Sequence, residues 1–177
     1  VVVALRFALW AAFVMWGLTF INAGLDYQTI GVSFMHNVNL VFHEAGHVIF
    51  SPFGEFMTVL GGSLAQVLVP AVCIVALVYS ARDPFGASLG LWWLGQSLID
   101  VAPYIADARV MELPLLSGAT GSDKELSHDW RRILLDLGML DSDRAIANAV
   151  QHAGDAIMLA AFAWGGYMLL QQYRTRD

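Results

Sequence analysis

Five long apolar runs constrain this chain more than any other feature of its sequence. A helix needs about 20 mostly apolar residues to cross a hydrocarbon core roughly 30 Å thick, because it rises about 1.5 Å per residue. The chain is 58% hydrophobic and 14% charged, which is too apolar for a soluble domain of this length. We therefore expect an all-α fold, a single polytopic membrane domain with about five transmembrane helices. The expected spans are residues 1–21, 34–50, 56–80, 86–101 and 154–173.

Short polar linkers limit how these helices connect. The segment 51–54, Ser-Pro-Phe-Gly, ends the second run, since proline and glycine cannot continue a helix. The linker is so short that the second and third helices must be antiparallel neighbours. Pro103 is expected to interrupt the fourth run. The opening run lacks a charged lead with a small-x-small site, which favours a retained span over a signal peptide.

The segment between the last two runs, about residues 106–153, belongs in water. It holds eight of the fifteen acidic residues and five of the nine basic ones. Within it, the apolar residues of Ser127–Leu137 recur at helical spacing around Trp130, which predicts an amphipathic helix at the membrane interface. Asp141-Ser142-Asp143 is typical of the cap of another short helix leading into the last span.

Charge and cysteine content exclude several classes of partner. The net charge is -6 and the nine basic residues are spread along the chain, so nothing favours nucleic acid. The single cysteine, Cys73, allows no internal disulfide. The expected partners are the lipid bilayer and other membrane proteins.

The segment His43-Glu44-Ala45-Gly46-His47 carries the strongest chemical signal. Histidines four residues apart lie on one face of a helix, so both imidazoles can bind one ion. Glu44 then projects beside the ion, where it can take a proton from a water molecule and pass it to a leaving amine. The pattern predicts a Zn²⁺ site with His43 and His47 as ligands and Glu44 as the catalytic base.

The setting of this motif strengthens the prediction. Ionisable groups inside an apolar run are costly unless they face a protein cavity and have partners. His36 and Asn39 precede His43 and His47 at steps of three and four residues, which predicts one polar helix face turned to the bundle interior. For His36 and Asn39, hydrogen bonding to neighbouring helices is the alternative to a role in the site.

A catalytic zinc site needs a third protein ligand and one open position. Three residues are candidates: Asp100, Asp107 and His128. The two aspartates flank Pro103, and carboxylates at the end of an apolar span are tolerated only beside a cavity or a partner. His128 could fold back over the zinc as a ligand or lid, or could be part of a surface helix cap beside Asp129.

The chain resembles the site-2 protease family of intramembrane zinc proteases over roughly residues 34–108. The resemblance rests on Phe42-His-Glu-Ala-Gly-His-Val48 and on Asp100-Val-Ala-Pro-Tyr-Ile-Ala-Asp107-Ala. In that family an Asn-x-x-Pro motif, followed by Asp-Gly, supplies the third ligand from a broken helix. The resemblance therefore implies Asp107 as the third ligand. Here Asp100 replaces the family's asparagine, Ala108 replaces its glycine, and the spacing is one residue shorter.

The closer resemblance is to a bacterial branch of these peptidase-like membrane proteins. In such a branch, His128-Asp129-Trp130 would be a feature of its own. This resemblance implies a multi-pass location in the bacterial inner membrane.

Three amides can support the zinc site. Gln66, Gln96 and Asn39 are candidates for orienting a zinc ligand or the substrate. For Gln66, which follows Gly61-Gly62-Ser63, hydrogen bonding within a tight helix pair is the alternative.

Two functions follow from these observations. The first is a zinc-dependent intramembrane metalloprotease that hydrolyses a peptide bond of a transmembrane protein in or next to the membrane. The alternative is a non-proteolytic structural or assembly subunit of a larger membrane complex that uses the same fold. Glu44→Gln separates them, since only a protease loses turnover.

Overall fold

The computed structural model describes residues 2–114, 120 and 128–174, and over these residues the fold is all-helical, as the sequence predicts. Val1 and Ser127, the expected starts of two elements, lie outside the described residues, as does much of the expected aqueous loop. The helices are α1 (Val2–Ala23), α2 (Tyr27–Ile30), α3 (Phe34–Phe50), α4 (Glu55–Tyr79), α5 (Pro84–Ala106), α6 (Asp129–Asp136) and α7 (Asp143–Arg174).

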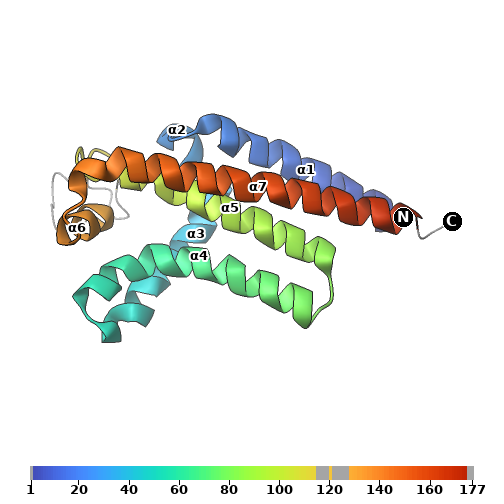
Figure 1. The fold of residues 1–177 in the computed structure, drawn as a ribbon, viewed down its shortest axis with the longest axis horizontal. Helices are drawn as coiled ribbons and strands as arrows, with labels where there is room; N and C mark the ends of the chain where they lie inside the picture. The colour runs from blue at the N-terminus through green and yellow to red at the C-terminus, as the bar shows by residue number, and fades with distance from the viewer. Residues whose placement is uncertain (1, 115–119, 121–127, 175–177) are drawn as a thin grey trace.

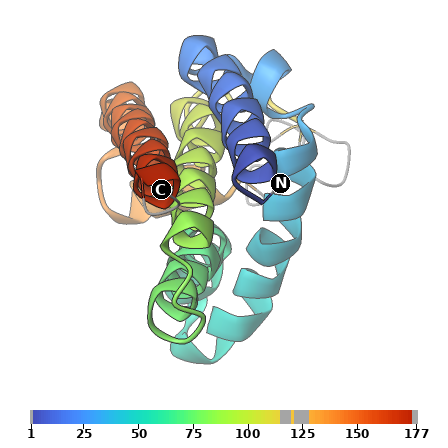
Figure 2. The same ribbon diagram turned by 90° about the vertical axis from the view of Figure 1, so that its right-hand side faces the viewer.

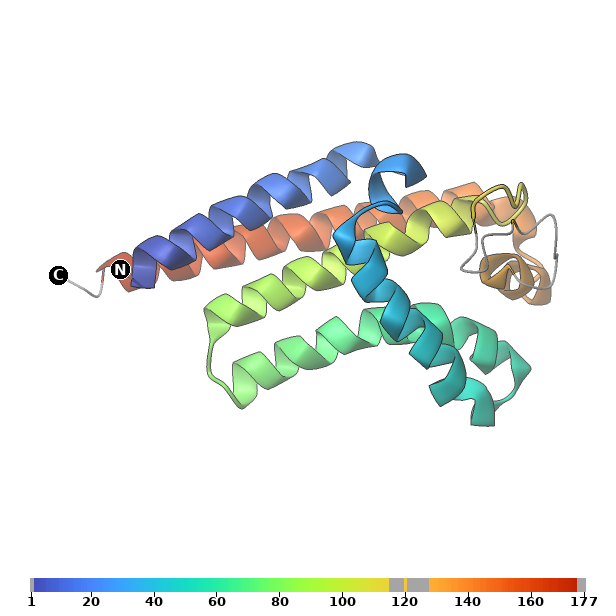
Figure 3. The same cartoon turned by 180° about the vertical axis from the view of Figure 1, so that it is seen from behind.

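Three long helices, α1, α5 and α7, run side by side along the molecule (Figure 1). The start of α1 and the end of α7 lie at one end of this layer, and α6 lies at the other (Figures 1 and 3). α4 packs along α5, and α3 crosses steeply while packing mainly against α4 (Figures 2 and 3). The α3–α4 hairpin therefore closes one side of α5, and α7 covers another.

The core between the long helices is aromatic and apolar. Trp92 of α5 is 1% exposed and packs edge-on against Phe13 and Phe20 of α1. Its indole N–H donates to the Phe13 carbonyl oxygen at 3.0 Å. Met158 of α7 is fully buried in the same cluster. These contacts fix α5 as the central helix, and α5 carries Asp100 and leads directly into Asp107.

A side-chain cap, a turn of 3₁₀ helix and two glycines set the position of α3. The Ser33 hydroxyl accepts a hydrogen bond from the His36 N–H at 3.1 Å and so begins the helix. At the other end, a turn of 3₁₀ helix over Ser51–Phe53 leads to α4. A Cβ on Gly46 would lie 2.1 Å from the Gly61 carbonyl oxygen, so the two backbones touch at this point. This close approach brings the histidine face of α3 against α4.

Two helix boundaries differ from the sequence prediction. The prediction that Pro103 interrupts the fourth run was wrong, since α5 continues to Ala106. Proline lacks an N–H and its ring crowds the carbonyl group four residues earlier, but α5 ends at Ala106, so this disturbance falls in the last turn. The expected separate helix after the Asp141-Ser142-Asp143 cap is instead the first part of α7, which begins at Asp143 and continues unbroken to Arg174.

Three segments are long and apolar enough to cross a membrane among the residues that the structure describes. They are Val2–Ala23, Glu55–Tyr79 and Leu140–Arg174. Large apolar side chains on their surfaces, such as Leu5, Val72 and Leu170, are more than half exposed. These features identify a membrane protein.

Candidate metal centre

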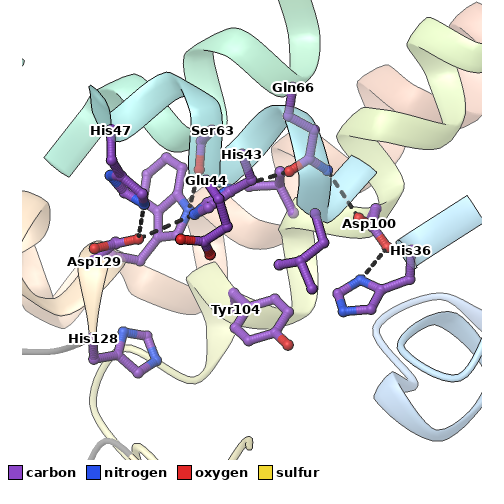
Figure 4. A pocket seen from close by; sticks show the side chains of 13 residues that line it. His36, His43, Glu44, His47, Ser63, Gln66, Asp100, Tyr104, His128 and Asp129 are labelled. Carbon is purple, nitrogen blue, oxygen red and sulfur yellow. Dashed lines mark hydrogen bonds and ion pairs between the residues drawn. The ribbon is translucent and has the colours of Figure 1, made fainter. Parts of the chain in front are cut away.

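The imidazoles of His43 and His47 point to the same place, as their spacing on the helix predicts, and a carboxylate from α6 meets them there (Figure 4). His43 Nε2 lies 3.1 Å from Asp129 Oδ2, and His47 Nε2 lies 3.2 Å from the same oxygen. One ligand atom from each of the three residues lies within 4.8 Å of the other two. No other such group of three occurs within residues 2–114, 120 and 128–174.

The second nitrogen of each ring is also held. His43 Nδ1 lies 3.3 Å from Gln66 Oε1, and His47 Nδ1 lies 2.8 Å from the Thr58 carbonyl oxygen. An oxygen of this kind can only accept, so each Nδ1 carries the hydrogen and donates it. Each Nε2 faces Asp129, and a cation that replaced the hydrogens between them would be bound through Nε2, the arrangement that zinc-bound histidines usually show.

The orientation of Gln66 is itself determined by its neighbours. Its Nε2 donates to Asp100 Oδ2 at 2.8 Å and to the Ser97 carbonyl oxygen at 3.3 Å. Both partners are acceptors, so the amide nitrogen must face them and Oε1 must face His43. Asp100 therefore acts on His43 through Gln66.

A glycine on α4 makes room for the two rings. A Cβ on Gly62 would lie 2.6 Å from His43 Nε2 and 2.7 Å from His47 Nε2. Any side chain at this position would displace the atoms that face Asp129. The glycine therefore belongs to the site itself, beyond the general packing of small residues that the sequence suggested.

Asp129 is the first residue of α6, and several contacts hold this short helix over the site. The Trp130 indole N–H donates to the Ser63 hydroxyl at 3.1 Å, and Arg132 forms an ion pair with Glu55. Burial by itself would raise the pKa of Asp129, but the hydrogen bonds from His43 and His47 outweigh it and lower this pKa to about 2. Asp129 is thus anionic at neutral pH.

Glu44 lines the same cavity as the histidines (Figure 4). The cavity has a volume of about 460 Å³ and extends from His47 past His43 to His36. Among the described residues, no hydrogen bond or ion pair ties down the Glu44 carboxylate. It is placed to exchange protons with a molecule in the cavity.

The structure does not bring Asp107, the expected third ligand, to the two imidazoles. Its carboxylate accepts hydrogen bonds from the Glu112 and Leu113 N–H groups, each at 3.0 Å, and from His128 Nε2 at 3.2 Å. Burial acts to raise the pKa of Asp107, and these donors lower it below its usual value. The carboxylate is fully used in closing the turn after α5.

His128 is not brought to the imidazoles as a ligand either, although it lines the cavity. Its Nδ1 accepts the Arg131 N–H at 3.2 Å and caps α6, so Nε2 carries the hydrogen that faces Asp107. The expected helix cap at this position is formed by His128 itself, but it is buried and does not lie on the surface. The pair of His128 and Asp107 positions α6, and with it Asp129.

Asp100 lies in a buried polar network away from the two Nε2 atoms. Its carboxylate accepts from Gln66, from Asn39 Nδ2 at 3.1 Å and from His36 Nδ1 at 3.0 Å. Gln96 Oε1 accepts from Asn39 at 2.7 Å, and neither amide contacts His43 or His47. Of the three amides that the sequence offered as supporting groups, only Gln66 touches His43 or His47.

Comparisons with protein-family models, with curated proteins and with solved structures give no match for this chain. The site must therefore be interpreted from its own chemistry. Two imidazoles and one carboxylate form the type of donor set that catalytic zinc sites use, with a fourth position left for water or substrate. The fixed Nδ1 atoms and the anionic Asp129 both fit a divalent cation.

From the sequence alone, His128 and not its neighbour Asp129 is a candidate ligand. The signal was present in the three residues His128-Asp129-Trp130. Each has a separate task in the structure: His128 caps α6 and Trp130 docks it onto α4, while Asp129 faces the histidines. A polar residue between a cap and an anchor is held rigidly, which favours a ligand.

Proposed function

We propose that this chain is a zinc-dependent metalloprotease that hydrolyses a peptide bond in or next to the membrane. The observation that carries the proposal is the convergence of His43 Nε2, His47 Nε2 and an Asp129 oxygen, with both Nδ1 atoms held by fixed acceptors. A metal site with only a structural role needs no unpaired carboxylate beside it. Here the Glu44 carboxylate, which has no partner among the described residues, lines the cavity.

Each residue has a defined task in the proposed reaction. His43, His47 and Asp129 would hold the ion, and Gln66 and Thr58 would keep the rings oriented. Zinc would supply Lewis acidity, which acidifies water and polarises the scissile carbonyl group. The Glu44 carboxylate would accept the proton of the attacking water and deliver it to the leaving amine.

We also propose that α3 and α5 lie within the membrane beside α1, α4 and α7, which gives the five-span arrangement. α5 has 23 residues and α3 has 17, so both have roughly the length of a hydrocarbon core. The outward face of α3 is apolar, with Val41, Val48 and Ile49 all more than 60% exposed. α6 would then lie outside the hydrocarbon, at the membrane surface.

The proposed substrate is the transmembrane segment of another protein. Such a segment must unwind before cleavage, because a hydrogen-bonded helix hides its carbonyl groups. The resemblance of the motif His43-Glu44-Ala45-Gly46-His47 to site-2 proteases supports this class. A bacterial inner membrane is the setting that the same resemblance suggests.

The test combines metal analysis with turnover on purified full-length protein. Wild type and Glu44→Gln are loaded with zinc and incubated with a library of detergent-solubilised transmembrane peptides, and cleavage is read by mass spectrometry. We expect equal zinc contents and a loss of cleavage of about 100-fold or more in Glu44→Gln, the usual contribution of a general base. Glu112→Gln, an exposed carboxylate outside the cavity, is the matched control and should cleave like wild type.

The rival function, a structural or assembly subunit, gives the opposite result. Wild type would then bind zinc and cleave nothing, and Glu44→Gln would behave identically. A chain that binds no zinc would exclude the metalloprotease altogether.

A further inference from the structure

The cavity has a second polar end that the proposed chemistry does not use. Its lining changes along α3 from His43 and His47 to Leu40 and then to His36. Asp100 and Tyr104 of α5 complete the far end (Figure 4). The cavity therefore has a metal-binding end, an apolar middle and a second polar end.

His36 is held so that one ring edge remains available. Its Nδ1 faces Asp100 Oδ1 at 3.0 Å, and its ring stacks on Tyr104 with 6.1 Å between centroids and 10° between planes. Among the described residues, no hydrogen bond uses His36 Nε2. Since the Asp100 carboxylate can only accept, His36 Nδ1 carries a hydrogen, and the neutral form of the ring presents Nε2 as an acceptor.

The distance between the two ends suits an extended peptide. His36 and His43 are seven residues apart on α3, which corresponds to roughly 10 Å along the helix. An extended chain advances about 3.3 Å per residue, so a peptide along α3 would place its third residue from the cleaved bond near His36. The residues between would face the apolar middle at Leu40 and Val101.

From these observations we infer that His36, Asp100 and Tyr104 form a substrate subsite that selects an uncharged hydrogen-bond donor three residues from the cleaved bond. This inference rests on the proposed protease function. Serine, threonine, asparagine and glutamine carry such donors and can bond to His36 Nε2. The nearby Asp100 carboxylate repels an acidic side chain, and an aliphatic one leaves Nε2 without a partner.

The experiment is a cleavage profile of wild type and two His36 variants with the transmembrane peptide library. The wild type should show the four donor residues enriched about threefold to tenfold at the third position from the cut, the value of one hydrogen bond. His36→Ala should still cleave but lose this enrichment. His36→Phe should give the same profile, and it keeps a ring for stacking on Tyr104 in case the alanine variant unfolds.

Controls separate a subsite from a structural role. Asn37→Ala changes an exposed polar residue next to His36 that bonds only to the Ser33 carbonyl oxygen, and it should keep the wild-type profile. Zinc content should be unchanged in all variants, because His36 contacts none of the three proposed ligands.

The outcomes are distinct. Cleavage with no preference at the third position, or a preference for aspartate and glutamate there, overturns the subsite and leaves the protease function standing. Loss of zinc in both His36 variants also overturns it, since His36 would then be structural. If wild type binds zinc and cleaves no peptide, the proposed function fails and the subsite fails with it.

Discussion

Asp129 and Asp107 each accept hydrogen bonds from histidine at the same end of the molecule, yet their surroundings differ. Asp129 meets two ring nitrogens from α3 and keeps 27% of its side chain exposed to the cavity. Asp107 is 8% exposed and already accepts two backbone N–H groups as well as His128. A cation can replace the ring hydrogens that Asp129 accepts. Asp107 can bind a cation only if it loses its backbone hydrogen bonds, which would open the turn after α5.

The comparison shows what distinguishes a ligand from an anchor in this molecule. Both aspartates are close to a histidine and both have a lowered pKa, so neither property identifies the metal site. The difference lies in the remaining partners. The donors around Asp129 are ring nitrogens, whose hydrogens a cation can replace. Two of the donors around Asp107 are backbone N–H groups, whose hydrogens a cation cannot replace.

Substitutions of the two aspartates should differ strongly in their effect on zinc affinity. Asp129→Ala should weaken zinc binding by more than about 100-fold, which exceeds the usual cost of losing an outer-shell partner. Asp107→Ala should weaken it by less than about 10-fold, since it acts only through the position of α6. Competition with a chromophoric chelator measures both. A larger loss for Asp107→Ala would assign the ligand role to the family-type aspartate instead.

The next effect concerns the amide that orients His43. Gln66→Leu removes the acceptor of the Nδ1 hydrogen and should weaken zinc binding by about 10-fold to 100-fold. Gln96→Leu changes another buried amide that bonds to Asn39 but to no proposed ligand, so its zinc affinity should match wild type. Equal losses in the two variants would mean that the polar network supports the fold and not the metal.

Asp107→Ala should instead loosen α6. Its removal leaves two backbone N–H groups and the buried His128 ring without their acceptor, at a cost of about 1–3 kcal/mol. Hydrogen exchange of the α6 amides in metal-free protein measures this cost. Unchanged protection of α6 would contradict the anchoring role.

The same variant gives a pH test. The folded pKa of Asp107 lies below its usual value, so its contribution is complete above the unfolded pKa of about 4 and is lost as the pH falls through the folded pKa. The protection of α6 in wild type should therefore approach that of Asp107→Ala in acid. A difference that grows as the pH falls would contradict this sign.

The smallest effect is expected at the surface. The ion pair of Arg132 with Glu55 also ties α6 to α4, but Glu55 is exposed, and exposed pairs contribute only about 0–1 kcal/mol. Arg132→Ala should change zinc affinity and α6 protection less than Asp107→Ala does, by the same chelator competition and hydrogen exchange. A larger loss would show that the surface pair, and not the buried one, holds the helix.

The helices and the first half of the site could be predicted from local sequence. Apolar runs and linker residues define helices because both effects act over a few neighbouring residues, and His43 and His47 share a face by helical periodicity alone. The third proposed ligand depends on where α6 docks, and docking depends on Trp130, Ser63 and a glycine at 62 from distant parts of the chain. No local pattern around Asp129 encodes those contacts.

Pro103 shows the same limit on a smaller scale. Its sequence context predicts a break, and the family resemblance made that break the source of a ligand at Asp107. In the structure Pro103 lies within the last turn of α5, and the backbone N–H groups of Glu112 and Leu113 donate hydrogen bonds to the Asp107 carboxylate. The outcome depends on the turn that follows the helix, which the motif itself does not contain.

We propose that His43, His47 and Asp129 bind one zinc ion. Crystals of the zinc-loaded protein, measured on both sides of the zinc absorption edge, test it most directly through the anomalous difference map. We expect one peak about 2.0–2.2 Å from both Nε2 atoms and from an Asp129 oxygen. A peak beside Asp107 or Asp100, or a zinc-loaded crystal in which no ion lies beside the Nε2 atoms of His43 and His47, would exclude this zinc site.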